Sequence, residues 1–408
     1  MIRVCHLAYI YGTNNTGGAA IAATRLHREL LATGVDSHYI CVKQYESGKN
    51  VYQLPYGVKR KLFFFASRIL RGIWKLTRYG KAIPLNIVPL FGLNALLEKL
   101  HPDIVHIQWI NADVASFEQL SRLPYKCIFN LHDLFIINAM DAYPFSDMRF
   151  ITGFDKENSA WLERFLFDRK KRMIERLNPS FIGPSKWVCE QSRTSLIGRN
   201  RNADAIPNII DDAYFENLSL STANSLRGCF VIMFGAFGGR RNTTKGFDDL
   251  STALDLLPVE MKQACELRIY GEEAEPCETS GIHTIFLGNI DNVATMIQEL
   301  SKADVFAFPS KAETQGMTKV EALLCGIPVV TFDRTACAEG IEHGFNGWIA
   351  KDGDIQSFAS GLHYYFHCWQ LGYLDKLKQS MMNYARAEYN IKSIINRTIA
   401  LYNTISHT

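Results

Sequence analysis

Glu313, Gly316 and Glu321 have the residue types and the spacing to bind a small anionic ligand that also carries hydroxyl groups. Around them, residues 303–332 alternate an apolar strand, a polar loop, a helix carrying Glu321 and a second apolar strand. Ligands of open α/β sheets bind beyond the carboxyl ends of such strands. The amides that open the helix lack intrahelical partners and favour phosphate, and they belong to Gln315, Gly316, Met317 and Thr318. A carboxylate on either side can accept hydrogen bonds from hydroxyl groups.

A ligand with a phosphate between two groups of hydroxyls has the chemistry of a nucleotide sugar. The segment also resembles the Glu-x7-Glu signature of the family-four retaining glycosyltransferases. The resemblance implies the α/β fold called GT-B, in which two doubly wound Rossmann-like domains face each other across a cleft. It also implies that Glu313 contacts the donor sugar, that Glu321 holds the ribose, and that the intervening amides bind phosphate. Many members carry Gly-Phe where this chain has Thr314-Gln315.

A nucleotide sugar has a diphosphate leaving group, which basic side chains would stabilise. The segment GAFGGRRNTTKGF contains three such side chains. Arg240, Arg241 and Lys245 would neutralise the charge that grows on the β-phosphate when the glycosidic bond breaks. The resemblance matches Lys245 to a family lysine and leaves open whether Arg240 or Arg241 is the partner arginine. With Glu313, Lys245 is one of three predicted catalytic residues, and His132 is the third.

Motifs in the first half of the chain are weaker alone. Gly17 and Gly18 lie between a strand and a helix, where missing side chains let a ligand approach the backbone, although such a pair is also common in tight turns. His132 ends a strand in the phrase FNLHDLF and resembles the family histidine that contacts the donor sugar, although a purely structural role is also open. Acceptor contacts are predicted after neighbouring strands, at Trp109, Asn111, Asp133, Asp141 and Tyr143.

The resemblance implies a reaction that needs no metal or resident cofactor, only the nucleotide sugar as co-substrate. Asp352-Gly353-Asp354 mimics a metal-binding Asp-x-Asp motif. It follows the turn at Asn346, far along the chain from the phosphate loops, so we interpret it as a surface turn.

The alternation of strands and helices over 408 residues predicts two domains. We place the acceptor-side domain at 1–207, a linker at 208–227, and the nucleotide-sugar domain at 228–387. In the family a terminal helix, here about 388–408, packs back on the first domain.

Between Ser47 and Leu97 there are nine lysines and arginines and no acidic residue, although the whole chain carries a net charge of only +3. Aromatic and aliphatic residues interleave with them, a pattern typical of helices at anionic membrane surfaces. We expect surface contacts from Arg68, Arg71, Trp74, Lys75 and Arg78. A solvated helix packed on its own domain is the alternative. Nucleic acid is a weaker explanation, because no recognition module accompanies the charge.

No secretory signal or membrane-spanning stretch is evident, and ten scattered cysteines indicate reduced thiols. We therefore expect a cytoplasmic protein, peripheral on the inner face of the cytoplasmic membrane. The predicted activity is retaining transfer of a sugar from a nucleoside diphosphate, UDP favoured over GDP, to a lipid-linked saccharide in surface polysaccharide synthesis. Two alternatives remain open: a sugar-phosphate phosphorylase or epimerase of the same fold, and a non-catalytic carbohydrate-binding protein.

Overall fold

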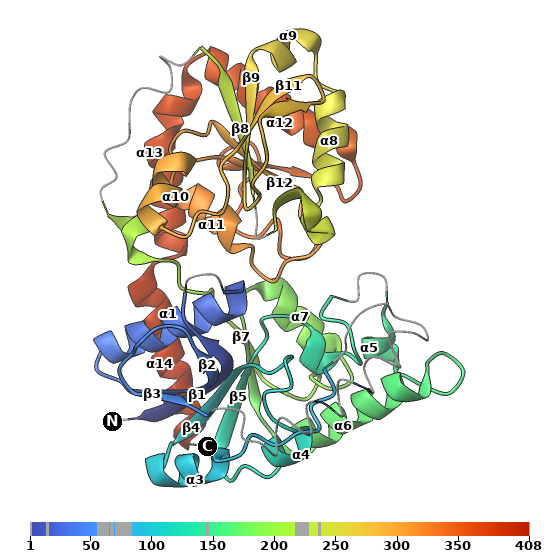
Figure 1. Ribbon diagram of the computed structural model, residues 1–408, viewed down its shortest axis with the longest axis vertical. Coiled ribbons are helices and arrows are strands. Elements are labelled where there is room, and N and C mark those ends of the chain that lie inside the picture. The colour runs from blue at the N-terminus through green and yellow to red at the C-terminus, as the bar shows by residue number, and fades with distance from the viewer. Residues whose placement is uncertain are drawn as a thin grey trace. The chain divides into compact units, whose positions relative to one another are not determined.

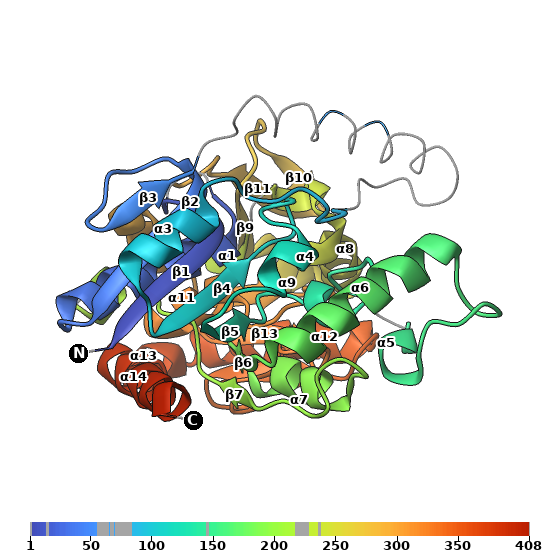
Figure 2. The same ribbon diagram turned by 90° about the horizontal axis from the view of Figure 1, so that it is seen from below.

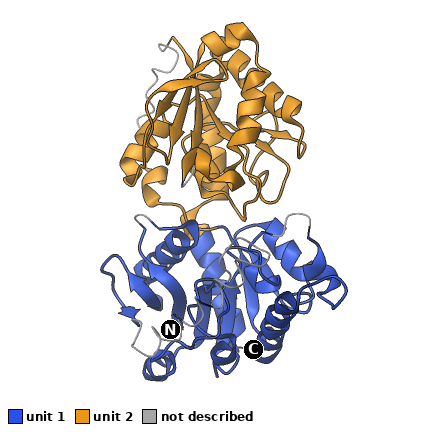
Figure 3. Cartoon of the chain, turned by 45° about the vertical axis from the view of Figure 1, so that its right-hand side comes forward, with its two compact units in different colours: residues 1–207, 394–408 blue, residues 208–393 orange. Residues whose placement is uncertain are grey.

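The computed structural model describes residues 2–13, 16–54, 65, 69, 84–143, 147–216, 228–235 and 238–407. The chain divides into two compact units (Figure 3). Unit 1 comprises residues 1–207 and 394–408, and unit 2 comprises residues 208–393. The chain thus leaves unit 1 once and returns to it at Ile394.

Unit 1 contains a parallel seven-stranded sheet in the order β3-β2-β1-β4-β5-β6-β7, part of which runs side by side in Figure 2. Its strands are β1 (Arg3–Tyr11), β2 (Asp36–Gln44), β3 (Val51–Gln53), β4 (Ile104–Trp109), β5 (Lys126–Asn130), β6 (Ser180–Gly183) and β7 (Ala203–Ala205). Its helices are α1 (Gly18–Ala32), α3 (Leu93–Leu100), α4 (Phe117–Leu120), η2 (Phe135–Ile137), α5 (Arg149–Thr152), α6 (Trp161–Leu177), α7 (Lys186–Thr194) and, from residue 394, α14 (Ile391–His407).

The two faces of this sheet differ in chemistry. Because side chains alternate along a strand, Cys5 and Leu7 of β1 enter a large apolar core, while His6 between them lies on the opposite face. On that face the imidazole of His6 contacts His106 of β4 at 5.2 Å between ring centroids. There α14 packs through Tyr402, whose hydroxyl is 2.7 Å from Nδ1 of His106. The second face therefore carries polar rings among its apolar side chains.

Unit 2 contains a seven-stranded sheet in the order β10-β11-β9-β8-β12-β13-β14, parallel except for the β10–β11 pair. Figure 1 labels β8, β9, β11 and β12 of this sheet. Its strands are β8 (Phe230–Gly235), β9 (Cys265–Tyr270), β10 (Cys277–Thr279), β11 (Ile282–Phe286), β12 (Val305–Phe308), β13 (Val329–Phe332) and β14 (Gly347–Ala350). Its helices are η3 (Asp212–Phe215), η5 (Gly239–Arg241), η6 (Thr243–Lys245), α8 (Phe247–Asp255), α9 (Val259–Gln263), α10 (Val293–Leu300), α11 (Met317–Leu324), α12 (Ile355–Gln370) and α13 (Tyr373–Glu388).

The strand orders create a switch point in each sheet. In unit 1 the chain order reverses between β1 and β4, and in unit 2 it reverses between β8 and β12. Connections from two such strands run in opposite directions, which leaves a crevice at the carboxyl ends. The segments with Gly17, Asn111, Lys245 and Glu313 all follow one of these four strands.

Residues 208–227, which we expected to form a linker, begin as part of unit 2. Ile210 and Tyr214 are buried in its apolar core, and the carbonyl oxygen of Tyr214 accepts a hydrogen bond of 3.2 Å from Nη2 of Arg386. We placed the linker from the polar composition of residues 217–227. The apolar side chains just before that stretch belong to the core of unit 2.

The predicted membrane segment lies largely outside the described residues, and this holds for each of Arg68, Arg71, Trp74, Lys75 and Arg78. Among the helices that the structure describes, none combines the length and apolar character needed to cross a membrane. All ten cysteines lie in the described residues and are thiols outside disulfide bonds, and eight of them are buried. Burial raises the pKa of Cys5, Cys127 and Cys337 to about 12, so these thiols stay protonated at neutral pH.

Candidate functional site

Glu313 follows β12 in unit 2 and is held by contacts to both its carboxylate and its backbone. Nζ of Lys245 lies 2.5 Å from Oε1 of Glu313, and the Ser310 hydroxyl donates to the same oxygen at 3.0 Å. The amide of Glu313 donates to the Thr335 hydroxyl oxygen at 3.0 Å, and its carbonyl oxygen accepts from the amide of Ala336 at 3.2 Å. Only 12% of the Glu313 side chain is exposed, so the carboxylate is held in a defined position.

The Lys245–Glu313 ion pair joins two predicted residues that are 68 positions apart in the chain. An ammonium has three donors, and a carboxylate has several acceptor positions. Each group can therefore keep this bond and still bind a ligand.

Gly316 begins α11, and its backbone requires glycine. Its φ is +77°, and an added Cβ would lie 2.6 Å from Cζ of Phe308. The backbone amides that follow are those of a helix first turn and suit an anion. The Gln315 side chain turns inward instead: it is buried, and its Oε1 accepts from the amide of Asn208 at 3.0 Å.

Glu321 lies farther along α11 and is half-buried, as are Met317 and Thr318. The carboxylate of Glu321 lies near Tyr270 of β9: burial, and secondarily this negative charge, raise the pKa of the Tyr270 phenol. The structure thus brings Glu313, Gly316 and Glu321 onto one loop and helix at the end of β12, as the sequence predicted.

The two candidate arginines differ in their surroundings. Nε and Nη2 of Arg240 each lie 3.1 Å from a carboxylate oxygen of Glu272, and its guanidinium lies 4.5 Å from the centroid of the Phe286 ring. The side chain of Arg241 is 83% exposed, with Nε 3.8 Å from Oε1 of Glu272. Arg240 is therefore held in place by Glu272, a residue that was not predicted from the sequence.

Three of the predicted acceptor residues meet at the ends of β4 and β5 in unit 1. Oδ2 of Asp133 accepts from Nε1 of Trp109 at 3.1 Å and from Nδ2 of Asn111 at 2.6 Å. Its Oδ1 accepts from the amide of Phe135 at 2.9 Å. Burial raises the pKa of Asp133, and these hydrogen bonds oppose that rise.

His132 is held by a network of buried amides and imidazoles. Its Nε2 lies 3.0 Å from Oε1 of Gln108 and must donate, because an amide oxygen only accepts. Gln108 also accepts from Asn130 at 3.1 Å, and its Nε2 lies 2.9 Å from Nδ1 of His6. Burial lowers the pKa of His132 to about 4, so the ring is neutral at pH 7. Gln108 was not predicted, and nothing in its apolar strand context signals it.

The remaining predicted residues of unit 1 lie in the segments that follow β1 and η2. Gly17 and Gly18 are exposed at the start of α1, and Gly17 has no neighbouring atom that an added Cβ would meet. Asp141 is exposed and Tyr143 half-buried, farther along the loop after η2. The carbonyl oxygen of Asp141 accepts from Nδ2 of Asn138 at 3.0 Å.

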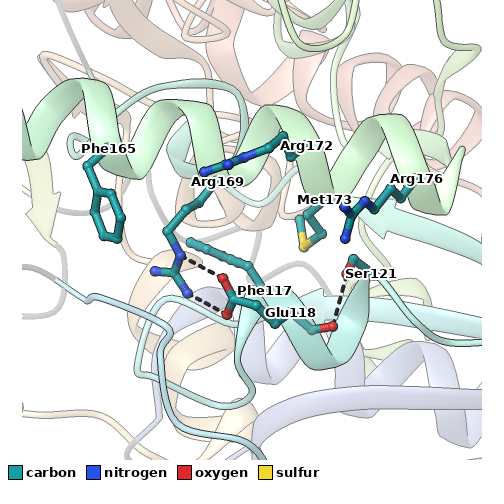
Figure 4. Close-up of a pocket in the computed structure, with 8 residues that line it drawn as sticks. All are labelled: Phe117, Glu118, Ser121, Phe165, Arg169, Arg172, Met173 and Arg176. Carbon is teal, nitrogen blue, oxygen red and sulfur yellow. Dashed lines mark hydrogen bonds and ion pairs between the residues drawn. The ribbon is translucent and has the colours of Figure 1, made fainter.

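A cavity of about 210 Å³ in unit 1 lies between α4 and α6 (Figure 4). Nε and Nη2 of Arg169 bind Glu118 at 2.8 and 2.6 Å, and its Nη1 donates to the Leu85 carbonyl oxygen at 2.7 Å. The guanidinium of Arg169 is therefore already hydrogen-bonded to groups of unit 1. None of the predicted site residues lines the cavity, which is formed by Phe117, Glu118, Ser121, Phe165, Arg169, Arg172, Met173 and Arg176.

The Asp-Gly-Asp motif has structural contacts. Asp354 caps α12 by accepting from the amide of Ser357 at 2.9 Å, and Asp352 lies 2.6 Å from Nε of Arg334. Gly353 has a φ of +80°. Among the described residues no cluster of three histidine, cysteine or acidic side chains could hold a metal ion.

Two family models match the chain over its two units. The model described as Glycosyltransferase Family 4 matches residues 16–214, and that described as Glycosyl transferases group 1 matches residues 234–388. The chain belongs to the family-four glycosyltransferases, which have the GT-B fold.

Curated relatives match over short segments. The amylovoran biosynthesis glycosyltransferase AmsK of Erwinia amylovora is 36% identical over 67 residues, which is 15% of this chain and 16% of that protein. The sulfoquinovosyl transferase SQD2 of Arabidopsis thaliana is 29% identical over 143 residues, 32% of this chain and 26% of that protein. The chain therefore spans about a quarter or less of the length of these relatives.

Solved structures match over the whole chain. Sucrose-phosphate synthase from Thermosynechococcus elongatus is 16% identical, with 99% of each chain covered and a TM-score of 0.70. Anabaena HepE in complex with UDP-glucose is 16% identical, with 98% of this chain and 100% of that chain covered and a TM-score of 0.64. At these identities the likeness establishes the fold.

Proposed function

We propose that this protein is a retaining glycosyltransferase that moves a sugar from a nucleoside diphosphate sugar, UDP favoured over GDP, to a saccharide acceptor. The observation that carries the proposal is the arrangement of Glu313, Lys245 and the amino end of α11 in unit 2. It supplies a hydroxyl acceptor, a cation and an anion-binding helix terminus in one place. The UDP-glucose in the complex of HepE supports the preference for UDP.

In the proposed reaction the bond between the sugar carbon and the β-phosphate oxygen breaks, and its electron pair stays on that oxygen. The acceptor hydroxyl attacks the sugar on the face that the phosphate leaves and gives its proton to the phosphate oxygen, so configuration is retained. Lys245 stabilises the leaving charge, and Glu313 orients the sugar hydroxyls. Neither a protein nucleophile nor a metal ion enters this proposal.

The donor assignment can be tested with UDP and GDP sugars. A bound ligand raises the melting temperature by mass action, so a thermal-shift panel identifies the donor, and a transfer assay with saccharide acceptors follows. Dependence on free phosphate, or turnover without any acceptor, would favour a phosphorylase or epimerase. Absence of both transfer and donor hydrolysis would favour a carbohydrate-binding protein.

Two variants separate the roles of the glutamates. Glu321→Ala should weaken binding of free nucleoside diphosphate, because Glu321 is assigned to the ribose. Glu313→Ala should mainly lower turnover, by the loss of a charged hydrogen bond worth about 1.5 to 3 kcal/mol. Calorimetric titration with UDP and initial-rate kinetics measure the two effects. An equal loss of UDP affinity in both variants would contradict the assignment.

We also propose a lipid-linked acceptor in surface polysaccharide synthesis, and a cytoplasmic enzyme docked on an anionic membrane by its basic segment. The support is the run of nine basic residues without an acidic one between Ser47 and Leu97. Reversing Arg68, Arg71, Lys75 and Arg78 to glutamate should abolish co-sedimentation with anionic vesicles, as high salt should. UDP binding should stay unchanged. Equal sedimentation of the two proteins would remove the membrane proposal, and a large drop in melting temperature would favour a helix packed on its own unit.

A further inference from the structure

Lys319 is a fully buried lysine on α11, between Thr318 and Glu321, which are assigned to the donor. Its Nζ donates to the carbonyl oxygens of Ala336, Cys337 and Glu339 at 3.0, 3.1 and 2.6 Å. These bonds use all three donors of the ammonium. One side chain thus binds three carbonyl groups of the segment from Arg334 to Gly340, which follows β13 and is called the clamped loop below.

The clamped loop also holds Glu313. Thr335 of this loop accepts from the Glu313 amide at 3.0 Å, and Ala336 donates to the Glu313 carbonyl oxygen at 3.2 Å. Sγ of Cys337 lies 3.4 Å from the carbonyl oxygen of Ser310, whose hydroxyl donates to the Glu313 carboxylate. Lys319 is therefore connected to Glu313 through the backbone and two side chains of one loop.

Filling the core does not require an ammonium group at this position. The neighbours of Lys319 on the buried side of α11 are apolar, among them Val320 and Leu323. Burying a charge among them costs free energy unless every donor is paired. Burial lowers the pKa of Lys319 to about 8. The contacts that offset this cost all go to the clamped loop, so the loop conformation depends on them.

We propose that Lys319 is a positioning residue for Glu313: it fixes the clamped loop, and through Thr335 and Ala336 the loop fixes the carboxylate that orients the transferred sugar. This inference rests on the proposed function of Glu313. Displacing a reacting or orienting group by about 1 Å can lower turnover about 100-fold. Lys319 itself contacts no substrate, and binding of the nucleotide does not depend on it.

The test compares Lys319→Met, Thr335→Val and the double variant with wild type. Thr335→Val keeps the side-chain shape and removes the oxygen that accepts from Glu313, while the lysine clamp stays intact. We expect kcat to fall about 10- to 100-fold in each single variant, with the Kd for UDP within twofold of wild type. The double variant should be no slower than the slower single variant, because both changes break one chain of contacts.

Lys378→Met is the matched control. Lys378 is also a buried lysine of unit 2, on α13, with Nζ 3.4 Å from the carbonyl oxygen of Ser301. A kcat within twofold of wild type is expected for this variant. A similar loss in Lys378→Met would assign the Lys319 effect to general destabilisation and overturn the inference.

Three further outcomes would overturn the inference: wild-type kcat in a folded Lys319→Met protein, wild-type kcat in Thr335→Val, or effects that multiply in the double variant. Thr335→Val decides the question if Lys319→Met does not fold. Wild type assayed in parallel distinguishes failure of the proposed function from failure of the positioning role. Absence of sugar transfer by wild type removes the proposed function and this inference with it, whereas transfer by wild type with unchanged variants removes only the positioning role.

Discussion

The two units use the same device to hold a loop and differ in how they hold the carboxylate beside it. In unit 1, Nζ of Lys170 donates to the carbonyl oxygens of Phe135, Asn138 and Ala139 at 2.6, 3.0 and 3.0 Å. In unit 2, Lys319 does the same for the clamped loop. Asp133 in unit 1 is bound by neutral donors, whereas Glu313 in unit 2 is bound by the cation of Lys245. The carboxylate in unit 1 is thus held by hydrogen bonds from neutral groups, and the carboxylate in unit 2 by an ion pair.

The cores differ in a related way. Every buried histidine among the described residues lies in unit 1, and burial is the largest cause of a lowered pKa in all five, His6, His27, His38, His106 and His132. Among the described residues of unit 2 the buried charged groups are lysines and carboxylates, such as Lys319 and Asp304, and no histidine is buried. The units should therefore respond differently to acid, and variants should affect them separately.

The largest expected effect is acid unfolding of unit 1. Burial lowers the pKa of His27 and His132 to about 4 and of His106 to about 3, from 6.5 in the unfolded chain. Below pH 6.5 the unfolded state therefore takes up protons that the folded state does not. Stability is complete above pH 6.5 and falls as the pH drops towards 4, by on the order of 3 kcal/mol for each histidine.

Hydrogen exchange at pH 7 and pH 5, corrected for the intrinsic rate, measures this difference. Amides of β1 and β4 should lose protection at pH 5, while those of β8 and β12 keep theirs. His106→Gln removes one titrating group and should reduce the pH dependence. Equal loss of protection in both units would show that the buried histidines do not decide acid stability.

Removing the cation from the unit 2 carboxylate has the next largest effect. Lys245→Met should lower kcat about 10- to 150-fold, corresponding to the loss of a charged hydrogen bond of about 1.5 to 3 kcal/mol. Initial rates at saturating donor measure it, and Lys378→Met is again the control. Unchanged kinetics would transfer the role in leaving-group stabilisation to Arg240 or Arg241.

Asp133→Asn should have a smaller and different effect. Asparagine keeps one acceptor oxygen and places an NH2 at the other position, so it loses either the hydrogen bonds from Trp109 and Asn111 or the one from the Phe135 amide. We expect the KM for the acceptor to rise about tenfold, as for one lost hydrogen bond, and the Kd for UDP to stay unchanged. A weaker UDP affinity would place Asp133 in donor binding instead.

The smallest effects separate the two arginines. Arg240→Met leaves the buried carboxylate of Glu272 without its close cation, which should lower the free energy of unfolding by about 1 to 3 kcal/mol. Arg241→Met removes an exposed contact and should change stability by less than about 0.5 kcal/mol. Urea unfolding compares them. A larger loss in the Arg241 variant would contradict the roles that their surroundings indicate.

The central strands and the donor loop were predictable because their signals are local. Apolar runs such as Val305–Phe308 identify buried parallel strands, and Gly316 marks a position at which the backbone excludes a side chain. The strands that lack such a signal are β3, β7, β10 and β14, each three or four residues long and each at a sheet edge. Edge strands are short and half-covered, so they lack a continuous apolar run.

The partners of the site residues were not predictable, because they depend on contacts distant in sequence. Nothing near Lys245 indicates that it pairs with Glu313, and Thr335 and Gln108 have no distinctive sequence context. Lys170 and Lys319 had a usable signal: each interrupts the apolar stripe of its helix, where a lysine must find buried acceptors. A search for lysines within apolar helix stripes would have identified Lys170 and Lys319. It would not have identified the loops whose carbonyl groups they bind.

The return of the chain to unit 1 at Ile394 sets an order for folding during synthesis. The sheet of unit 1 is complete in the first 207 residues, but the face with His106 is covered by Tyr402 of α14. Those residues leave the ribosome only after all of unit 2. Domains fold largely as they are made. The sheet face of unit 1 that carries His106 therefore stays uncovered while unit 2 is synthesised and folds. The nascent chain is thus most vulnerable in the unit that is translated first.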